Sequence, residues 1–467
     1  MKVAKRFAAA CVLCALLAHA PEGRAAEPRL YQLAAPVDVW DADAEDLNGD
    51  GRKELFALLC DSKTWPYRKS VALYEGGPET GFSAQPDHVA ALPEETGVVF
   101  FSEQTGQPPR ELIAAHAAGA VCYTVSMDGF QEWKRVDFNS ILPTQTREPL
   151  FLKKLSVDLD RDGIEEWLLP TAAGHQLYTS AGLKATIPSP MISSFRGGDT
   201  SYITYQIPAF DTFDLGGDGP LGIGFANDEF ADFSHGPGWE QHWRFTVPHA
   251  LDEKWESTVR IDDINGDRFP DLMITQTQGT INLESRTQIY VSGKPFSYPA
   301  SPTAEFSAKG ATTSPALADV NGDELLDVIV VRIPFGVANM VSYLVRGKVS
   351  VNLEIYAFDG KKYSETPAFT TDITMDAPDG REQVAYTIGD FNNDKKIDIA
   401  YAQGENSLAL HQGDPARFLS DKPWLKLEVP SFGVARAFKL DGEGSDDIVL
   451  FHPSGPHSKR IDVILFE

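Results

Sequence analysis

The sequence predicts an all-β chain built by radial repetition of one small unit. Three observations support this expectation: an acidic loop recurs along the chain, strand-like segments flank each copy, and the copies keep a regular spacing. Self-similarity at a fixed period is the usual sign of a repeat architecture. We therefore expect one repeat domain over residues 26–467, preceded by a signal peptide over residues 1–25.

The recurring loop reads Asp-x-Asn/Asp-x-Asp-(Gly)-x-x-Asp/Glu and is followed by an apolar residue. Its clear copies begin at Asp46 (DLNGDGRKEL), Asp158 (DLDRDGIEEW), Asp263 (DINGDRFPDL), Asp319 (DVNGDELLDV) and Asp390 (DFNNDKKIDI). Oxygen-bearing side chains occupy loop positions 1, 3, 5 and 9, and the backbone carbonyl of position 7 can add a fifth ligand. Ca²⁺ takes six to eight such oxygens in a flexible shell, so about five calcium sites are predicted.

The predicted ligands form five sets, in which the residue at position 7 contributes its carbonyl. They are Asp46, Asn48, Asp50, Arg52 and Glu54; Asp158, Asp160, Asp162, Ile164 and Glu166; Asp263, Asn265, Asp267, Phe269 and Asp271; Asp319, Asn321, Asp323, Leu325 and Asp327; and Asp390, Asn392, Asp394, Lys396 and Asp398.

Position 6 of the loop is expected to be left-handed, because Gly51 and Gly163 stand there and glycine adopts that backbone without penalty. Arg268, Glu324 and Lys395 occupy the same position in the other three sets. A side chain there costs about 1 kcal/mol, so these three sets are expected to bind calcium more weakly.

Three worn copies occur at the same spacing. They begin at Glu103 (EQTGQPPREL), Asp214 (DLGGDGPLGI) and Lys439 (KLDGEGSDDI). The first two lack most ligands and are predicted to be metal-free. In the third, the ammonium of Lys439 is expected to stand in for the ion against Asp441, Glu443 and Asp447. Eight units of about 55 residues then fill the chain.

Each unit offers four short strands. A near-continuous apolar segment leaves each loop, as in residues 54–59 and 327–331, which is typical of strands buried on both faces. Two further strands follow, such as residues 71–75 and 88–92. Four antiparallel strands repeated radially describe a β-propeller blade, so we expect a single propeller of about eight four-stranded blades, with seven as the alternative.

The ends of the chain are expected to share one blade. The last unit shows only two strands after its loop begins, at residues 447–451 and 460–466. The segment Arg29–Leu33 can supply the missing outer strand. Pairing of the two termini would remove a sheet edge that otherwise invites aggregation.

The DxNxDGxxDL loop between two strands, at blade spacing, resembles the FG-GAP/VCBS repeat of integrin α-subunit-like β-propellers. The resemblance covers essentially the whole chain after residue 25. It implies that the loop joins the inner two strands of a blade and binds Ca²⁺. With loops placed between core strands, the ions are expected to stabilise the fold rather than to act as a switch.

The first 25 residues read as a secretory signal. Lys2, Lys5 and Arg6 precede the apolar segment 7–20, and Gly23-Arg24-Ala25 offers small residues for cleavage. We expect an exported protein that is periplasmic, outer-surface or secreted, with no transmembrane segment. Cys60 and Cys122 remain after cleavage, either as a disulfide or as buried free thiols. A formal charge of −26 argues against a nucleic-acid partner.

Two segments that interrupt the repeat are the predicted places for a partner. Residues 228–243 are read as an insertion between the second and third strands of the fourth unit, on the face opposite the metal loops. Their aromatic and histidine side chains suit a protein or glycan ligand, although Trp239, Trp243 and Phe245 could instead pack a local core. The partner-binding candidates are Phe230, Phe233, His235, Trp239, His242 and Trp243. Residues 335–348 are expected to form a short amphipathic helix.

No catalytic residues are predicted, because the nucleophile-elbow, phosphate-loop and zinc-protease motifs are missing from the sequence. The leading hypothesis is a calcium-stabilised propeller that acts as a binding, adhesion or scaffold module for a protein or glycan. The alternative is a carbohydrate-active enzyme, a polysaccharide lyase or hydrolase, on the same scaffold.

Overall fold

The structure is a computed structural model of the chain. It describes residues 27–466 apart from 78–80, 197–201, 217–218, 248–254, 280–283, 310, 313–314, 324, 334–346, 377–382, 415–416 and 443. The described residues form β-strands and one short 3-10 turn, η1 (Lys153–Leu155), with no α-helix among them. None of the helical structure in these ranges could span a bilayer. The predicted signal peptide lies outside the described residues.

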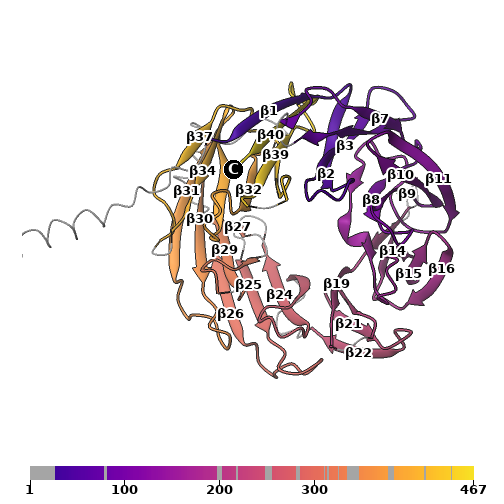
Figure 1. The fold of residues 1–467 in the computed structure, drawn as a ribbon. Helices are drawn as coiled ribbons and strands as arrows, with labels where there is room; N and C mark the ends of the chain where they lie inside the picture. The colour runs from indigo at the N-terminus through magenta and orange to yellow at the C-terminus, as the bar shows by residue number, and fades with distance from the viewer. Residues whose placement is uncertain are drawn as a thin grey trace, which may run out of the picture.

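Eight units, each built on four strands, stand in a ring, in chain order, around a central axis (Figure 1), and in blade 2 the short strand β12 (Leu150–Phe151) also pairs with β8. This confirms the β-propeller and settles the blade number at eight. From the axis outwards, the strands of blades 1 to 4 are β2 (Asp38–Glu45), β3 (Glu54–Asp61), β4 (Arg68–Tyr74) and β7 (His88–Ala91); β8 (Val98–Ser102), β9 (Glu111–His116), β10 (Gly119–Ser126) and β11 (Gly129–Asp137); β13 (Ser156–Val157), β14 (Glu166–Thr171), β15 (Gly174–Thr179) and β16 (Gly182–Ile187); and β19 (Ala209–Phe213), β20 (Gly222–Ala226), β21 (Phe230–His235) and β22 (Gln241–Thr246).

The second half of the ring repeats the arrangement. In blade 6 two short strands, β27 and β28, share the innermost place beside β29. The strands of blades 5 to 8 are β23 (Glu256–Asp262), β24 (Asp271–Gln278), β25 (Glu284–Tyr290) and β26 (Ala304–Lys309); β27 (Ala311–Thr312) with β28 (Ala316–Ala318), β29 (Asp327–Ile333), β30 (Lys348–Tyr356) and β31 (Phe369–Asp376); β32 (Tyr386–Gly389), β33 (Asp398–Gly404), β34 (Ser407–His411) and β37 (Leu425–Leu427); and β38 (Val434–Phe438), β39 (Asp447–Phe451), β40 (Arg460–Leu465) and β1 (Arg29–Ala34).

The hydrophobic core is divided among the contacts between blades. Eight apolar clusters occur, one between each pair of neighbouring blades around the ring. Between blades 1 and 2, for example, Phe56 of β3 meets Phe101 of β8 with ring centroids 4.8 Å apart. Each sheet therefore packs on both faces, and this explains why the strands that leave the loops are apolar at successive positions.

The two ends of the chain close the ring in blade 8, as predicted. Strand β1 pairs antiparallel with β40, in a register that sets Arg29 opposite Leu465 and Ala34 opposite Arg460. Figure 1 shows the indigo first strand lying beside the yellow last ones. Cys60 of β3 and Cys122 of β10 are buried free thiols in adjacent blades.

The connections fall on two faces of the ring, because successive strands run antiparallel. The acidic loops lie on one face, and the connections between second and third strands and between blades lie on the other. The prediction of an insertion at residues 228–243 is wrong, since these residues form β21 and β22 of blade 4. The expected helix at residues 335–348 falls mostly outside the described residues.

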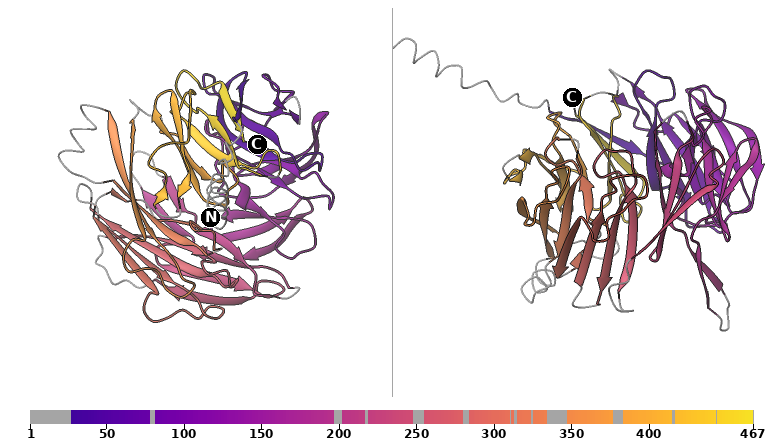
Figure 2. Two further views of the ribbon diagram at one scale, coloured as in Figure 1. Left: turned by 60° about the vertical axis from the view of Figure 1, so that its left-hand side comes forward. Right: turned by 90° about the horizontal axis from the view of Figure 1, so that it is seen from below.

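A hairpin that the sequence analysis missed interrupts the repeat between blades 3 and 4. It consists of β17 (Ile192–Arg196) and β18 (Tyr202–Gln206), which pair only with each other. As a connection between blades it lies on the face opposite the acidic loops. In the right-hand view of Figure 2 it projects from the ring as a thin purple ribbon.

Ring closure through β1 predicts a difference between two leucines on the same strand. Leu33 is 1% exposed in the cluster between blades 8 and 1, whereas Leu30 is 46% exposed. We expect Leu33→Ala to lower the free energy of unfolding by about 2–4 kcal/mol, while Leu30→Ala changes it by less than about 1 kcal/mol. Urea titration of both variants measures this, and equal losses would show that β1 does not seal the core.

Candidate metal centres

The acidic loops join the first and second strands of their blades, as the repeat predicts. Position 6 is left-handed at Gly51 (φ +85°) and Gly163 (φ +89°), and also at Arg268 (φ +72°) and Lys395 (φ +63°). The expected backbone is therefore confirmed at these four positions, and Arg268 and Lys395 carry its steric cost. Glu324 lies outside the described residues.

The carboxylate at position 9 holds the loop closed in seven of the eight blades. One of its oxygens accepts a hydrogen bond from the backbone N–H of position 2, at 2.8–3.2 Å. The pairs are Glu54 with Leu47, Glu111 with Gln104, Glu166 with Leu159, Asp271 with Ile264, Asp327 with Val320, Asp398 with Phe391, and Asp447 with Leu440. We call this contact the carboxylate clamp. It is present in the worn loops of blades 2 and 8, so it does not depend on a full ligand set.

Blade 4 is the exception, because Gly222 stands at position 9. A Cβ atom on Gly222 would lie 2.1 Å from the ring of Phe213, so the aromatic ring fills the space that a clamp carboxylate would need. The loop of blade 4 is instead tied to its neighbour. The carboxylate of Asp214 forms an ion pair with the guanidinium of Arg161 in the blade 3 loop, with a nitrogen–oxygen distance of 2.7 Å.

Aspartate and glutamate use their second clamp oxygen differently. The second oxygens of Asp271, Asp327, Asp398 and Asp447 accept from the backbone N–H groups of Ser292, Phe358, Gly413 and Phe466, at 2.6–3.0 Å. Burial raises the pKa of Asp327 to about 6 and of the other three to about 7. These aspartates therefore serve as buried acceptors for the sheet, and any bound ion would share oxygens already engaged by the backbone.

In blade 1 the clamp residue is Glu54, whose side chain is longer than that of aspartate, and only one of its two carboxylate oxygens is bonded to the backbone. Glu54 is fully buried, and its Oε1 has no hydrogen-bond partner among the described residues. Burial raises the pKa of this carboxyl, and the nearby Asp50 and Asp46 raise it further, although the clamp bond from Leu47 opposes them. An uncompensated buried carboxylate oxygen is costly. The residues of blade 1 thus fit a hard divalent cation.

In blade 3 a cation of the chain itself reaches the carboxylates. The ammonium of Lys184 lies 2.6 Å from Asp160, 3.1 Å from Asp162 and 2.6 Å from Glu166. Burial lowers the pKa of Lys184, but the hydrogen bonds to these three carboxylates outweigh it and raise the pKa above its usual range.

Lys184 reaches the loop because of its place in β16. In the pairing of β15 with β16, Tyr178 faces Leu183 and Leu177 faces Ala185, so Lys184 is the extra residue of a β-bulge. Bulges re-aim side chains in this way. Asp158, Asp160 and Glu166 nevertheless place their oxygens within 4.8 Å of one another, so the same cluster could hold a metal ion if the ammonium withdrew.

The worn loop of blade 2 replaces ligands with protein contacts. Glu103 accepts from the backbone N–H groups of Thr105, Gly106 and Gln107. In blade 8, Lys439 is exposed and both oxygens of Asp447 bond the backbone, so Asp447 is not the partner expected for that ammonium.

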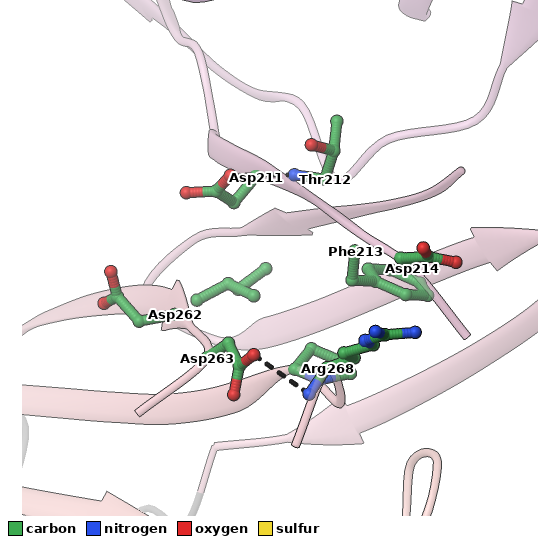
Figure 3. Close-up of a pocket in the computed structure, with 9 residues that line it drawn as sticks. Asp211, Thr212, Phe213, Asp214, Asp262, Asp263 and Arg268 are labelled. Atoms are coloured by element: carbon green, nitrogen blue, oxygen red, sulfur yellow. Dashed lines mark hydrogen bonds between the residues drawn. The ribbon is translucent and has the colours of Figure 1, made fainter. Parts of the chain in front are cut away.

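The loops of blades 4 and 5 border a pocket of about 290 Å³ (Figure 3). Asp211, Asp262 and Asp263 line it together with Arg268, whose backbone N–H donates to Asp263 at 2.9 Å. This hydrogen bond fixes the backbone at Arg268, which is position 6 of the blade 5 loop. The Arg268 side chain lies beside Asp214 of blade 4 in Figure 3.

Comparison with known proteins gives one family match. Residues 263–330, which hold the loops of blades 5 and 6, match the family described as FG-GAP-like repeat. The match thus covers two of the loops of the eight-bladed propeller. A comparison with curated proteins gives no match.

Solved structures with a similar course of the chain share about a tenth of its residues or fewer. BBS1N in complex with ARL6DN, from a crystal soaked with lead, is 9% identical over 80% of this chain and 93% of its own, with a TM-score of 0.38. The V. cholerae biofilm matrix protein Bap1 is 9% identical over 96% and 89%, with a TM-score of 0.34. The WD40 domain of SCAP from fission yeast is 9% identical over 94% and 98%, with a TM-score of 0.31.

The buried Oε1 of Glu54, which has no hydrogen-bond partner among the described residues, predicts that blade 1 binds calcium and that blade 2 does not. Glu54→Gln keeps an acceptor for the Leu47 N–H but removes the charge, so the number of ions bound in isothermal titration calorimetry should fall by one. Glu111→Gln makes the same change in the worn loop of blade 2 and should leave the number unaltered. An unchanged count in Glu54→Gln would contradict a site in blade 1.

Lys184 predicts that calcium must displace an ammonium in blade 3. In Lys184→Met the loop loses its internal cation, so the melting temperature in EGTA should fall and the rise on adding calcium should exceed that of the unmodified chain. Lys348→Met breaks a surface pair with Asp376 outside every loop and serves as the control. Equal calcium responses in Lys184→Met and the unmodified chain would show that Lys184 does not compete with the ion.

Proposed function

We propose that this chain is an exported, calcium-stabilised binding module that holds a protein or glycan partner on the face opposite its FG-GAP loops. The hairpin β17–β18 carries the proposal. Phe195 and Ile203, which face each other across its two strands, are 69% and 56% exposed. A two-stranded hairpin is marginal by itself, and exposed apolar side chains on a projecting element are typical of interaction sites.

Calcium is proposed as a fold-stabilising ligand. Its support is the oxygen-rich loop sequence together with the buried, unpartnered Oε1 of Glu54. Extracellular calcium modules bind at about 10⁻⁴ to 10⁻³ M. At roughly millimolar calcium each site then contributes about 0.4 to 1.4 kcal/mol. Export to a calcium-rich compartment, supported by residues 1–25, would therefore keep the loops loaded.

The aromatic side chains of residues 228–243 contribute less to this face than their sequence suggests. Phe233 and Trp239 are buried, and Trp243 packs against Phe296 with ring centroids 5.6 Å apart. His242 is exposed, but its ring contacts Ser234 at 2.9 Å within the same blade. Of the predicted partner-binding residues, Phe230 and His235 are half-buried at the two ends of β21.

The enzyme alternative would need carboxylates free to transfer protons near the axis. Several inner-strand carboxylates are instead paired with cations across blade boundaries. Asp41 of β2 lies 2.6 Å from Arg436 of β38, and Asp211 of β19 lies 2.7 Å from Lys154 of η1. Such pairs join neighbouring blades, so a binding role is the better-supported proposal.

Blocking one face at a time tests where a partner binds. Thr204→Cys on the hairpin and Gln107→Cys on the loop face each add one exposed thiol, to which a polyethylene glycol maleimide can be attached. Cys60 and Cys122 are buried, and burial raises their thiol pKa to about 11 and about 12, so they should stay unlabelled. We expect the Thr204 conjugate to lose ligands that the unmodified chain captures from a glycan array and an exported-protein fraction.

The Gln107 conjugate should retain the same ligands. Loss of binding in the Gln107 conjugate alone would show that the partner binds the face of the acidic loops. New reducing or unsaturated ends on any glycan incubated with the unmodified chain would replace the binding role with an enzymatic one.

A further inference from the structure

An aromatic side chain stands exposed on the face opposite the acidic loops. Trp65 lies in the connection between β3 and β4 and is 67% exposed, whereas no other tryptophan that the structure describes is more than 38% exposed. A single exposed apolar residue is common and by itself needs no explanation. The surroundings of Trp65, however, combine three features that together suit one class of ligand.

The first feature is that the indole ring is held in place. Tyr67, on the same connection, contacts it edge to face, with ring centroids 5.0 Å apart and an angle of 88° between the planes. The start of the turn is fixed as well, because the carboxylate of Asp61 accepts the backbone N–H of Lys63 at 3.1 Å. An edge-to-face contact leaves at least one face of the indole open to solvent. Such a flat apolar surface can pack against the C–H face of a sugar ring, whose hydroxyls stay in water.

The second feature is a pair of cations on the same connection. Lys63 and Arg68 are both exposed, and neither side chain forms an ion pair or a hydrogen bond within the part of the chain that the structure describes. Asp61 is the only acidic residue of residues 61–68, and it is half-buried. The chain as a whole has 67 acidic and 41 basic residues, so the charge of this connection differs from that of the chain. It is complementary to an anionic ligand.

The third feature is a cleft that begins at the same connection. Ser62 and Lys63 form part of the wall of a cleft of about 620 Å³, which is within the range of about 300–1,000 Å³ that is typical of small-molecule sites. Gln383 and Ser454 line it too, and both residues are exposed. Their amide and hydroxyl groups are therefore accessible to the hydroxyls of a ligand.

The other charged groups of the cleft are already engaged. Arg147 and Glu148 form an ion pair at 3.3 Å, and the carboxylate of Asp38 accepts from the hydroxyl of Ser458 at 2.8 Å. Lys63 is thus the charged side chain of the cleft that has no partner among the described residues. An anionic group of a ligand can pair with Lys63 while the rest of the ligand contacts the amide and hydroxyl groups of the cleft.

We propose that this surface binds an acidic oligosaccharide, whose sugar rings carry carboxylate groups, an inference that rests on the proposed binding face and names its ligand class. One sugar ring packs on the exposed face of Trp65, and neighbouring carboxylates pair with Lys63 and Arg68. The hydroxyls of the adjoining sugars extend into the cleft. Exposed ion pairs contribute little by themselves, so the affinity depends on stacking and charge acting together.

An anionic membrane is a less suitable partner for the same surface. Stable attachment takes about four to eight basic residues beside the membrane, or a wide apolar face. Within residues 61–68, all of which the structure describes, Trp65 is the only exposed large apolar side chain, and it is accompanied by only two exposed cations. A membrane would also leave the groups of the cleft unused, whereas an oligosaccharide uses all three features.

Removal of the indole tests the stacking contact. The probes are an array of oligosaccharides that carry uronic acids, each paired with its carboxyl-reduced form, followed by calorimetry with the strongest acidic binder. Trp65→Ala should weaken this binding about tenfold, because the sugar ring loses its apolar support. Trp133→Ala removes an exposed tryptophan with a lysine beside it, on the outer strand of blade 2, and should bind as the unmodified chain does.

Removal of the two cations tests the charge contact. Lys63→Gln together with Arg68→Gln should weaken binding about tenfold at low salt and make the affinity less dependent on ionic strength. Lys361→Gln together with Lys362→Gln removes two exposed charges from the connection between β30 and β31, on the face of the acidic loops, and should leave the affinity unchanged. The carboxyl-reduced oligosaccharides should bind about tenfold more weakly than the acidic forms.

The proposed ligand class is wrong if no acidic oligosaccharide binds, or if the carboxyl-reduced forms bind equally well. The proposed site is wrong if Trp65→Ala binds as tightly as the unmodified chain. Equally strong, Trp65-dependent binding to phosphatidylserine vesicles or to polyglutamate would replace the oligosaccharide with a membrane or an acidic peptide.

The Thr204 conjugate separates the Trp65 site from the hairpin of the proposed function. If that conjugate loses ligands that Trp65→Ala still binds, the binding face stands and the Trp65 site falls. If it keeps an acidic oligosaccharide that Trp65→Ala loses, the Trp65 site stands and the hairpin is not the place of binding. Because Lys63, Trp65 and Arg68 are exposed, their variants should melt as the unmodified chain does, and melting curves check this.

Discussion

The carboxylate clamp is the contact on which the blades depend. Each acidic loop makes a tight turn between the first two strands, and the turn leaves the N–H of position 2 pointing into the core. A buried carboxylate at the head of the second strand accepts that N–H in seven blades. Buried backbone donors are costly when unpaired, so the clamp fixes the loop even in the worn loops of blades 2 and 8. The other side chains of the loop can therefore vary without changing its shape.

Positive charge at the loops comes partly from the chain itself. Lys184 reaches three carboxylates in blade 3, and Arg161 reaches from blade 3 to Asp214 in blade 4. In these contacts a charge that belongs to the chain pairs with the loop carboxylates. Blade 1 differs, because the buried Oε1 of Glu54 has no partner among the described residues.

Much of the architecture could be predicted from the sequence, because the loop pattern fixes local geometry. The phase of the loops located the worn copies at Glu103, Asp214 and Lys439, and so gave eight blades and their closure through β1. The role of Lys184 could not be predicted. It depends on a β-bulge, which shifts the register by one residue without a clear sequence signal.

The misreading of residues 228–243 has a similar cause. The aromatic residues looked like an insertion because their strands are short and their turn contains Gly236 and Gly238. Their partners, Phe296 and Tyr298, come from blade 5, so the packing that buries them is not visible locally. The hairpin β17–β18 did have a local signal, since Gly197-Gly198-Asp199 separates two short alternating segments.

The closure of blade 8 has a consequence for how the chain is made. Strand β1 precedes every other strand of the ring in the sequence, yet its partner β40 follows all of them. The first strand must therefore stay unpaired until the rest of the ring has been synthesised. Contacts between such distant segments form slowly. A chain cut short before β40 therefore keeps its first strand without that partner and leaves a sheet edge exposed, of the kind that invites pairing with another chain.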